Sequence, residues 1–470
     1  MITPSWLPEG GTNLFQEIKK KCAEAEAAGQ KLWKLSIGQP TGAAMFEARL
    51  MASLATMIGA EPLSEYQDNG SPGTSFFYKL LERYPMNTFF SALKKTLPGE
   101  YLNLHQRNPL QEAMFVLGNA GRILQGLVLS EKPDPEMVRR NEMGFAREFS
   151  QFHVRTDLSQ VDGLAYLPIP GIKSMLGLIP MACGGINFGT VEMGTMTRPG
   201  YPTPETWAVY LLQQVSALPT NPENAFRFSP DDIINGGRFS AGLKLLMLNG
   251  PHNPTGQIFT REWLEEICEF CQKNGIRIFN DAAYAAMAYG SDHCTLADVA
   301  IKFPGLSWAE AYSASKMGCN FTGWRVGAII GSRDFVDDIA TIKGNTDSGF
   351  FAPAAVGVLA AIRYNPRAIL ANAKMFQERQ KYVVEILKEH GLQIACEPKG
   401  TFFNLWRLPK RAFGEAIRDA RHFNFLMIER TGLVGVHFHP YIRYAVVADV
   451  MEEAFTEALH QGFDMARVEY

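Results

Sequence analysis

Two short apolar runs on either side of an amphipathic helical pattern constrain the fold of this chain more than any other feature. The runs are LKLLMLN, residues 243–249, and IRIFND, residues 276–281, and TREWLEEICEFCQKNG lies between them. Thr260 is placed as the N-cap of this helix and Gly275 as its C-terminal stop. Because a strand, a helix and a second strand within roughly 40 residues form a βαβ unit, the pattern predicts a parallel sheet in an α/β fold.

Polar residues follow the predicted strands at the points where the strands end. Asn253 and Asp281 come after the two runs, and a third run, GLSWAEAYSAS, leads into Lys316 before the strand-like AIIGSRDF. In open α/β sheets, ligands bind at the carboxyl ends of the strands. We therefore expect one site to collect these three side chains.

Length and charge exclude several classes of protein. A chain of 470 residues is too long for one typical core, which favours two lobes. The net charge is −3 and no dense basic run occurs, so a small molecule is the expected partner rather than nucleic acid. No stretch reaches the roughly 18–20 apolar residues of a membrane span, so we expect a cytoplasmic protein without a membrane partner.

Metal-ligating residues do not form a pattern that favours a metal site. The seven cysteines are scattered, which suits a reducing compartment better than a disulfide framework. Cys268 and Cys271 form a single CxxC within a helical pattern, and two half-buried helix cysteines are favoured over zinc ligands. His437 and His439 alternate along one strand without a third ligand. We predict no metal.

The segment SASKMGCNFTGWRVG, residues 313–327, is the most diagnostic motif of the chain. A lysine can form an imine with an aldehyde and can later act as a base. The segment resembles the lysine motif of the class I/II aminotransferases, which are fold-type-I pyridoxal-phosphate enzymes. The resemblance implies that Lys316 carries pyridoxal 5′-phosphate as an imine and then moves a proton. Taken alone, SASK more often marks a surface lysine, so its weight depends on further motifs.

Further motifs occur in the order of this family, from about residue 35 to residue 443. For the cofactor's phosphate, the resemblance implies contacts with Ser313 and Arg325, although the interval from Lys316 to Arg325 is one residue longer than usual. The turn FVLGNAGRILQGL resembles the family's phosphate-facing helix start, where backbone N–H groups meet the anion. It implicates Ala120, Gly121 and Arg122, with a glycine at 121 where the family more often has a hydroxyl residue.

Three motifs match segments that hold the cofactor ring in the family. NDAAY resembles the motif whose aspartate keeps the pyridine nitrogen protonated, which implicates Asp281. Tyr284 and Asn253, the latter from NGPHNPTG, are implied partners of the phenolic oxygen O3′. PGYP resembles the segment whose aromatic residue stacks on the ring, here Tyr201, whereas the earlier IPGIKS lacks an aromatic residue. A helix N-cap is the alternative role for Asp281.

Substrate and subunit contacts are implied at both ends of the chain. YIRYAVV resembles the strand whose arginine binds the substrate α-carboxylate, which implicates Arg443. LSIGQP resembles the glycine turn facing the substrate, with Gly38 leaving room for the carboxylate. YQDNGSPG resembles the segment whose tyrosine, here Tyr66, reaches the neighbouring subunit's phosphate, which implies a homodimer. The alternatives are a surface arginine and ordinary loop residues.

The resemblance implies a fold-type-I architecture with a mostly parallel central sheet flanked by helices and a smaller α+β lobe. The predicted small domain comprises residues 1–48 and 345–470, and the large domain comprises residues 49–344 with an insertion at about 131–195.

The predicted function is transfer of an amino group from an L-amino acid to a 2-oxo acid, in the aspartate, aromatic and diaminopimelate branch. The predicted catalytic residues are Lys316, Asp281 and Tyr284. A lyase on the same fold is the first alternative, and a regulatory protein that binds pyridoxal phosphate is a remote one.

Overall fold

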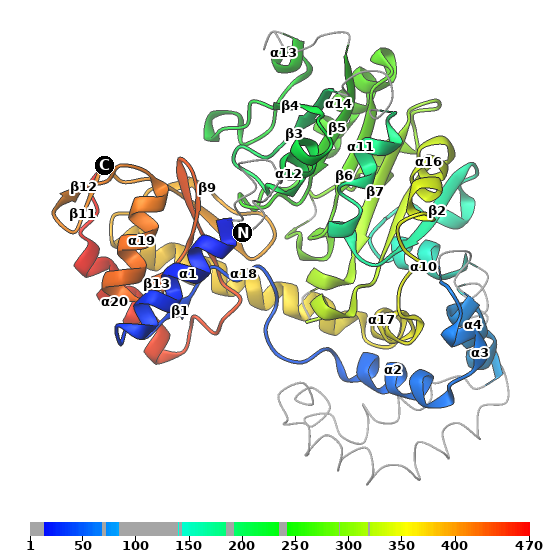
Figure 1. The fold of residues 1–470 in the computed structure, drawn as a ribbon, viewed down its shortest axis with the longest axis horizontal. Coiled ribbons are helices and arrows are strands. Elements are labelled where there is room, and N and C mark those ends of the chain that lie inside the picture. The colour runs from blue at the N-terminus through cyan, green and yellow to red at the C-terminus, as the bar shows by residue number, and fades with distance from the viewer. Residues whose placement is uncertain are drawn as a thin grey trace, which may run out of the picture. The chain divides into compact units, whose positions relative to one another are not determined.

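The structure, a computed structural model, divides into two compact units, each built from segments that are distant in the sequence (Figure 1). The first unit comprises residues 1–39, 173–310 and 372–470, and the second comprises residues 40–172 and 311–371. The residues that the structure describes are 14–67, 72–83, 140, 143–184, 192–234, 242–290, 292–317 and 320–470.

The predicted βαβ unit lies in the first unit. Strand β5, Leu243–Asn249, pairs in parallel with β6, Arg277–Asp281, and helix α14, Arg261–Asn274, connects them. The helix begins after Thr260 and ends before Gly275, which has a left-handed φ of 64°. Both boundaries agree with the prediction, because the apolar periodicity and the cap residues are local signals.

Two further strands extend this parallel pairing. They are β3, Glu192–Thr195, and β4, Gln214–Ala217, and the order within the first unit is β6-β5-β3-β4. Side chains of β5 are buried at almost every position, as expected for a parallel strand that is covered on both faces. The carboxyl ends of these strands therefore share one edge.

The C-terminal part of the first unit contains an antiparallel sheet. Its order is β14-β15-β10-β9, formed by Val436–Phe438, Tyr441–Ala445, Phe403–Arg407 and Ile394–Cys396. Helices α19, Ala420–Thr431, and α20, Glu453–Ala466, contribute to an apolar core with these strands. Leu35, Tyr284 and Met287 belong to the same core, so it joins three distant parts of the sequence.

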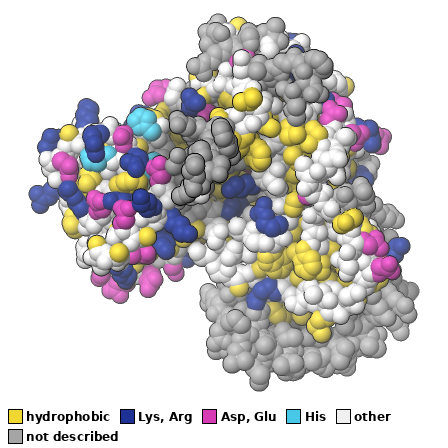
Figure 2. Space-filling view, in the orientation of Figure 1, with side chains coloured by type: hydrophobic (Ala, Val, Ile, Leu, Met, Phe, Trp, Pro, Cys, Tyr) yellow, Lys and Arg dark blue, Asp and Glu magenta, His cyan; other side chains and the backbone are white. Residues whose placement is uncertain are grey.

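Helix α1, Leu14–Ala27, packs against α19 with an apolar face and several charge pairs. Arg421 Nε lies 3.0 Å from Glu17 Oε2, and Lys21 pairs with Glu429. Lysine, arginine and acidic side chains are interspersed over this part of the surface (Figure 2). Exposed pairs of this kind contribute at most about 1 kcal/mol each to stability, so the apolar contacts contribute most to the packing of α1 on α19.

The second unit contains an antiparallel strand pair and a helical layer. Strand β2, Leu164–Ile169, pairs with β8, Gly327–Ser332, and α16, Arg333–Lys343, packs on both. Helices α2, Phe46–Ile58, and α17, Ala352–Tyr364, run side by side (Figure 1).

Strand β7, Trp308–Ser313, carries the chain from the first unit into the second, and helix α18, Pro366–Glu389, carries it back. Within residues 131–195, which were predicted to be an insertion, β2 and β3 pair with strands from the rest of the chain. The predicted domain boundaries and the status of this segment as an insertion stay predictions. Among the described residues, no helix is both long and apolar enough to cross a bilayer.

Candidate active site

Asn253 and Asp281 meet at the carboxyl ends of β5 and β6, where the sequence predicts a ligand site. Asn249 and Asp281 are the last residues of these strands and lie opposite each other. Asn253 follows in the loop after β5, and its backbone N–H donates to Asn249 Oδ1 at 3.0 Å. The parallel pairing therefore brings together two residues that are 28 positions apart in the sequence.

The Asp281 carboxyl group lies in a poorly solvated position. Burial raises its pKa to about 7, and the backbone N–H of Ala283, which donates to Asp281 Oδ1 at 3.2 Å, opposes this shift. Burial disfavours the charged form of an acid unless a cation or several donors compensate. A protonated ring nitrogen would be such a cation, so this carboxyl group fits the predicted role beside a pyridine ring.

Arg443 is buried, with 1% of its surface exposed, and it links three segments of the first unit. One terminal nitrogen donates to Asn253 Oδ1 at 2.9 Å and the other donates to the Ser36 carbonyl at 2.9 Å. The guanidinium carbon lies 4.1 Å from the centre of the Phe403 ring. Burial lowers the pKa of Arg443 to about 10, with the neighbouring Tyr284 acting in the opposite direction.

The Arg443 Nε atom has no hydrogen-bond partner among the described residues, although it is buried. A buried donor without a partner is costly, and a planar guanidinium suits a carboxylate that accepts two hydrogen bonds. The group therefore fits the predicted role of binding a substrate α-carboxylate. This contact itself stays a prediction.

Tyr284 packs beside Arg443 rather than facing solvent. Its ring lies 5.6 Å from that of Phe402 and 5.4 Å from that of Phe403, between centroids. Burial raises the pKa of its phenol, Arg443 opposes the shift, and the charged forms of Asp281 and Tyr201 reinforce it. Tyr201 therefore lies close enough to Tyr284 to affect its phenol, whereas the predicted stacking of Tyr201 on the cofactor ring stays a prediction.

Gly38 approaches this group of residues through its backbone. A Cβ atom at this position would lie 3.7 Å from Phe403 Cζ, which is an ordinary contact distance. Ser36, two residues earlier, accepts the hydrogen bond from Arg443. The LSIGQP segment is thus near the arginine, and a small side chain would also fit at Gly38. The predicted contact of Gly38 with the substrate stays a prediction.

The predicted residues of the second unit surround the turn after β7. Ser313 Oγ accepts the backbone N–H of Ser315 at 3.2 Å, and Lys316 ends the short 3₁₀ turn Ala314–Lys316 in a half-buried position. Ser313 therefore shapes the turn that carries the lysine. Its predicted phosphate contact stays a prediction.

Arg325 has a left-handed backbone with φ of 55°, which is unusual for a residue with a side chain. Its guanidinium lies against Gly171, where a Cβ atom would be 2.6 Å from an Arg325 nitrogen. Gly171 belongs to IPGIKS, the segment that lacks the aromatic residue needed for stacking on the cofactor ring. The predicted contact of Arg325 with the phosphate stays a prediction.

Some of the predicted site residues cannot be placed in the fold. Ala120, Gly121 and Arg122 lie outside the described residues, and so do residues 68–71 of YQDNGSPG and residues 318–319, between Lys316 and Arg325. Tyr66 is described, and 75% of its surface is exposed in the single chain. Its predicted contact with a neighbouring subunit stays a prediction.

Sequence reasoning missed four residues that shape this site. Phe403 lies under the Arg443 guanidinium, and the Ser36 carbonyl accepts from that arginine. Asn249 and Asn280, discussed below, hold the loops that carry Asn253 and Asp281. An asparagine at each strand end is the only signal that could have identified the last two.

Metal binding has no support in the part of the chain that the structure describes, where no group of three or more His, Cys, Asp or Glu residues is arranged to hold an ion. Cys268 and Cys271 are fully buried in α14, not half-buried as the sequence predicts, because both lie on the buried face of the helix. Burial raises the pKa of both thiols. The CxxC is therefore part of the helix core.

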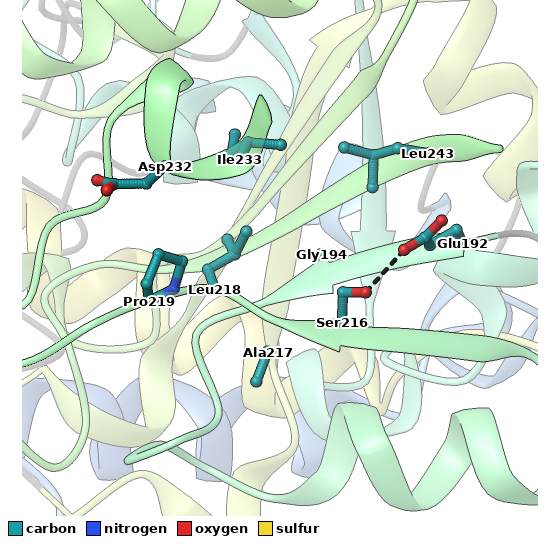
Figure 3. Close-up of a pocket in the computed structure, with 9 residues that line it drawn as sticks. All are labelled: Glu192, Gly194, Ser216, Ala217, Leu218, Pro219, Asp232, Ile233 and Leu243. Carbon is teal, nitrogen blue, oxygen red and sulfur yellow. Dashed lines mark hydrogen bonds between the residues drawn. The ribbon is translucent and has the colours of Figure 1, made fainter. Parts of the chain in front are cut away.

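A separate cavity of about 280 Å³ lies against β3, β4 and the start of β5 (Figure 3). Glu192 accepts a hydrogen bond from Ser216 Oγ at 2.7 Å at one side, and Asp232 lies at the other. None of the predicted site residues lines this cavity. The candidate active site is therefore the edge where β5 and β6 end.

Comparisons with known proteins show the family to which this chain is similar and its fold. The family described as aminotransferase class I and II matches residues 196–461, more than half of the chain. The LL-diaminopimelate aminotransferase of Gloeobacter violaceus is 30% identical over 56% of this chain and 65% of its own length. That of Methanocaldococcus jannaschii is 32% identical over 55% of this chain and 59% of its own. The chain thus spans about three fifths of the length of these relatives.

Solved structures extend the likeness to the whole fold. The aspartate aminotransferase of Rhizobium meliloti has a TM-score of 0.70 at 17% identity, and 99% of each chain is covered. At this identity the likeness concerns the fold alone. It confirms the predicted α/β architecture.

Proposed function

The chain belongs to the class I and II aminotransferase family, and on this basis we propose that it transfers an amino group from an L-amino acid to a 2-oxo acid with pyridoxal 5′-phosphate as cofactor. The bond between Arg443 and Asn253 carries the proposal, because it joins the residue proposed for the substrate carboxylate to a residue proposed for the cofactor. Members of this family depend on pyridoxal phosphate. When bound, the cofactor supplies an aldehyde that reacts with amines and a ring that accepts electrons.

Asp281 would hold the ring nitrogen as a cation, which would also lower the raised pKa of its own carboxyl group. Because Arg443 donates to Asn253 Oδ1, the Asn253 amide would keep its Nδ2 donor for O3′. Tyr284 would add a second donor, because its raised phenol pKa keeps the hydroxyl protonated. Tyr201 would cover the ring.

Lys316 would hold the cofactor covalently, and its Nζ atom would accept the α-proton of the substrate and return it. Ser313 and Arg325 would hold the phosphate, together with backbone N–H groups of residues 120–122. These roles rest on the family's motifs in this sequence. The left-handed backbone of Arg325 supports a functional reason for that residue.

Borohydride reduction of the purified protein tests this assignment. We expect a visible absorbance band that disappears on reduction, and a peptide in which Lys316 carries the reduced cofactor. The Lys316→Ala variant should neither show the band nor be labelled. Label on another lysine in the wild-type protein would overturn the assignment.

The names of the relatives guide the choice of substrate. Both relatives described above are called LL-diaminopimelate aminotransferase, so we propose an amino donor from the branch that includes aspartate, aromatic amino acids and diaminopimelate. A panel of such donors with 2-oxoglutarate or pyruvate as acceptor, followed by half-reaction spectra, identifies the donor. Formation of the 2-oxo acid with the carbon skeleton intact supports an aminotransferase, whereas loss of the side chain indicates the lyase alternative.

We further propose a homodimer and a cytoplasmic location. The exposed Tyr66 supports the first, because it lies in the segment that resembles the family's subunit contact. The scattered cysteines support the second.

A further inference from the structure

The side chain of Asn249 holds the backbone of both Asn253 and Asp281. Asn249 Oδ1 accepts the Asn253 N–H at 3.0 Å, and Asn249 Nδ2 donates to the Asp281 carbonyl at 2.8 Å. The two held residues are those proposed to contact O3′ and the ring nitrogen. One carboxamide therefore sets the backbone positions of two cofactor contacts.

Asn280 makes the reciprocal connection from β6 to the loop after β5. Its Oδ1 accepts the Gly250 N–H at 2.9 Å, and its Nδ2 lies 3.3 Å from the Gly250 carbonyl and 2.7 Å from Glu310 Oε1. Asn280 is 1% exposed and Glu310 is fully buried. The same carboxylate accepts the N–H groups of Leu296 and Ala297, so its position is itself fixed.

Both positions call for an asparagine for a chemical reason. A carboxamide is a short side chain that carries a donor and an acceptor together, and each of these two uses both. At Gly250 the backbone lies so close to the Phe259 ring that a Cβ atom would be 2.1 Å from it. The backbone groups of this turn are buried, and Asn280 satisfies both.

We propose that Asn249 and Asn280, here called the asparagine clasp, are positioning residues that fix the Asn253 amide and the Asp281 carboxylate in the geometry that binds pyridoxal phosphate. The inference rests on the proposed function and extends it to residues that do not touch the cofactor. The pairing of β5 with β6 ends at Asn249 and Asp281. Beyond this pair, the hydrogen bonds of the two asparagine side chains take the place of those between the strands. Arg443 fixes the Asn253 side chain, and Asn249 fixes its backbone.

The Asn249→Ala variant tests the clasp, and Asn224→Ala is a matched control. Asn224 Oδ1 accepts the Asn221 N–H at 3.0 Å and its Nδ2 donates to the Pro219 carbonyl at 2.6 Å, so it makes the same two kinds of bond. Both asparagines are half-buried. A purely structural role therefore predicts similar losses of thermal stability in the two variants.

We expect Asn249→Ala to weaken the binding of pyridoxal phosphate to cofactor-free protein about tenfold, whereas Asn224→Ala changes it less than about twofold. We also expect the pH midpoint of the visible absorbance band to rise by about 0.5 units in Asn249→Ala only. The reason is that a donor bond from Asn253 stabilises the ionised phenolic oxygen, and a displaced Asn253 loses this bond.

A second variant, Asn249→Ser, replaces the carboxamide with a single hydroxyl group, which can make only part of the two hydrogen bonds. It should bind pyridoxal phosphate more weakly than the wild type, and this comparison holds even if the alanine variant does not fold. Unchanged affinity and an unchanged midpoint in the folded Asn249 variants would overturn the clasp. Equal losses of affinity in Asn224→Ala would overturn it as well, since the effect would then be general. A wild-type protein that binds no pyridoxal phosphate would overturn the proposed function and the clasp together.

Discussion

Individual residues in this protein carry charge where solvent cannot easily support it. Asp281 has a pKa raised to about 7, and Arg443 has one lowered to about 10, in both cases mainly through burial. Each group is therefore less stable as an ion than the same group in water. A ligand group of opposite charge beside each residue would stabilise its charged form. A structural ion pair, in contrast, already has both charges within the chain. The Glu148–Arg363 pair, with N–O distances of 2.6 Å, is already satisfied within the chain.

The raised pKa of Asp281 predicts how the cofactor-free protein responds to pH. The native carboxyl group binds its proton up to about pH 7, whereas the unfolded one releases it near pH 4, so ionisation destabilises the native state as pH rises through this window. Asp281→Asn should raise the free energy of unfolding at pH 8 by about 1–3 kcal/mol and leave it unchanged at pH 4. Urea unfolding at both pH values measures this.

The exposed Asp337 on α16 provides the control for that experiment, because Asp337→Asn removes a carboxylate that water already solvates. Equal effects of the two substitutions at pH 8 would contradict the burial argument. The Asp281 variant should also bind pyridoxal phosphate more weakly, since the ring nitrogen loses its anion.

At the scale of elements, local signals in the sequence were sufficient to predict where helices and strands lie. They were not sufficient to predict which distant strands pair. The bounds of α14 and of β5 follow from periodicity and caps within a few residues of each end. The pairing of β2 with β8 joins residues more than 150 positions apart, and nothing in either strand specifies its partner. The clasp escaped prediction for the same reason, because an asparagine at a strand end is indistinguishable from an ordinary turn residue until both strands are placed.

Helices α2 and α17 approach closely enough to require a glycine. A Cβ atom at Gly357 would lie 2.5 Å from the Ala48 carbonyl oxygen and 2.6 Å from the Trp324 ring. Alanine normally stabilises a helix by about 1 kcal/mol relative to glycine, but backbone displacement costs about 1–3 kcal/mol. We expect Gly357→Ala to lower the free energy of unfolding by up to about 2 kcal/mol, because the displacement cost exceeds the gain in helix propensity.

Gly344→Ala, at the end of α16, is the matched control in the same unit. A Cβ atom there would lie 3.5 Å from its nearest neighbour, the Ala340 carbonyl oxygen, so no displacement is needed. The denaturation midpoints of the two variants separate the cost of displacing the neighbouring helix from the gain in helix propensity. A Gly357 variant as stable as the Gly344 variant would show that the helices can separate at no cost.

The whole molecule should lose stability in acid, because the lowered pKa values of the buried His252 and the half-buried His437 together outweigh the raised pKa of Asp281. Burial lowers the pKa of His252 and of His437 to about 4. His252 is held neutral between Thr255 Oγ1 at 2.8 Å and the Met196 carbonyl at 3.0 Å. Both imidazoles stabilise the native state fully above about pH 6.5, and this contribution is lost as pH falls toward 4.

Two histidines outweigh one aspartate, so the cofactor-free protein should be less stable at pH 5 than at pH 7.5, by about 1–3 kcal/mol. His437→Gln should reduce this loss, and Asp281→Asn should enlarge it. Guanidinium titrations at both pH values measure the three proteins. An identical loss in His437→Gln and in the wild type would show that His437 does not contribute.

The two cysteines of α14 can report local opening of this helix. Cys268 and Cys271 face the core of the helix that connects β5 to β6, and their raised pKa leaves almost no thiolate at neutral pH. Alkylating reagents attack the thiolate, so they can modify these positions only while α14 is detached. The alkylation rate therefore reports how often the helix that connects β5 to β6 opens, in native protein and without any substrate.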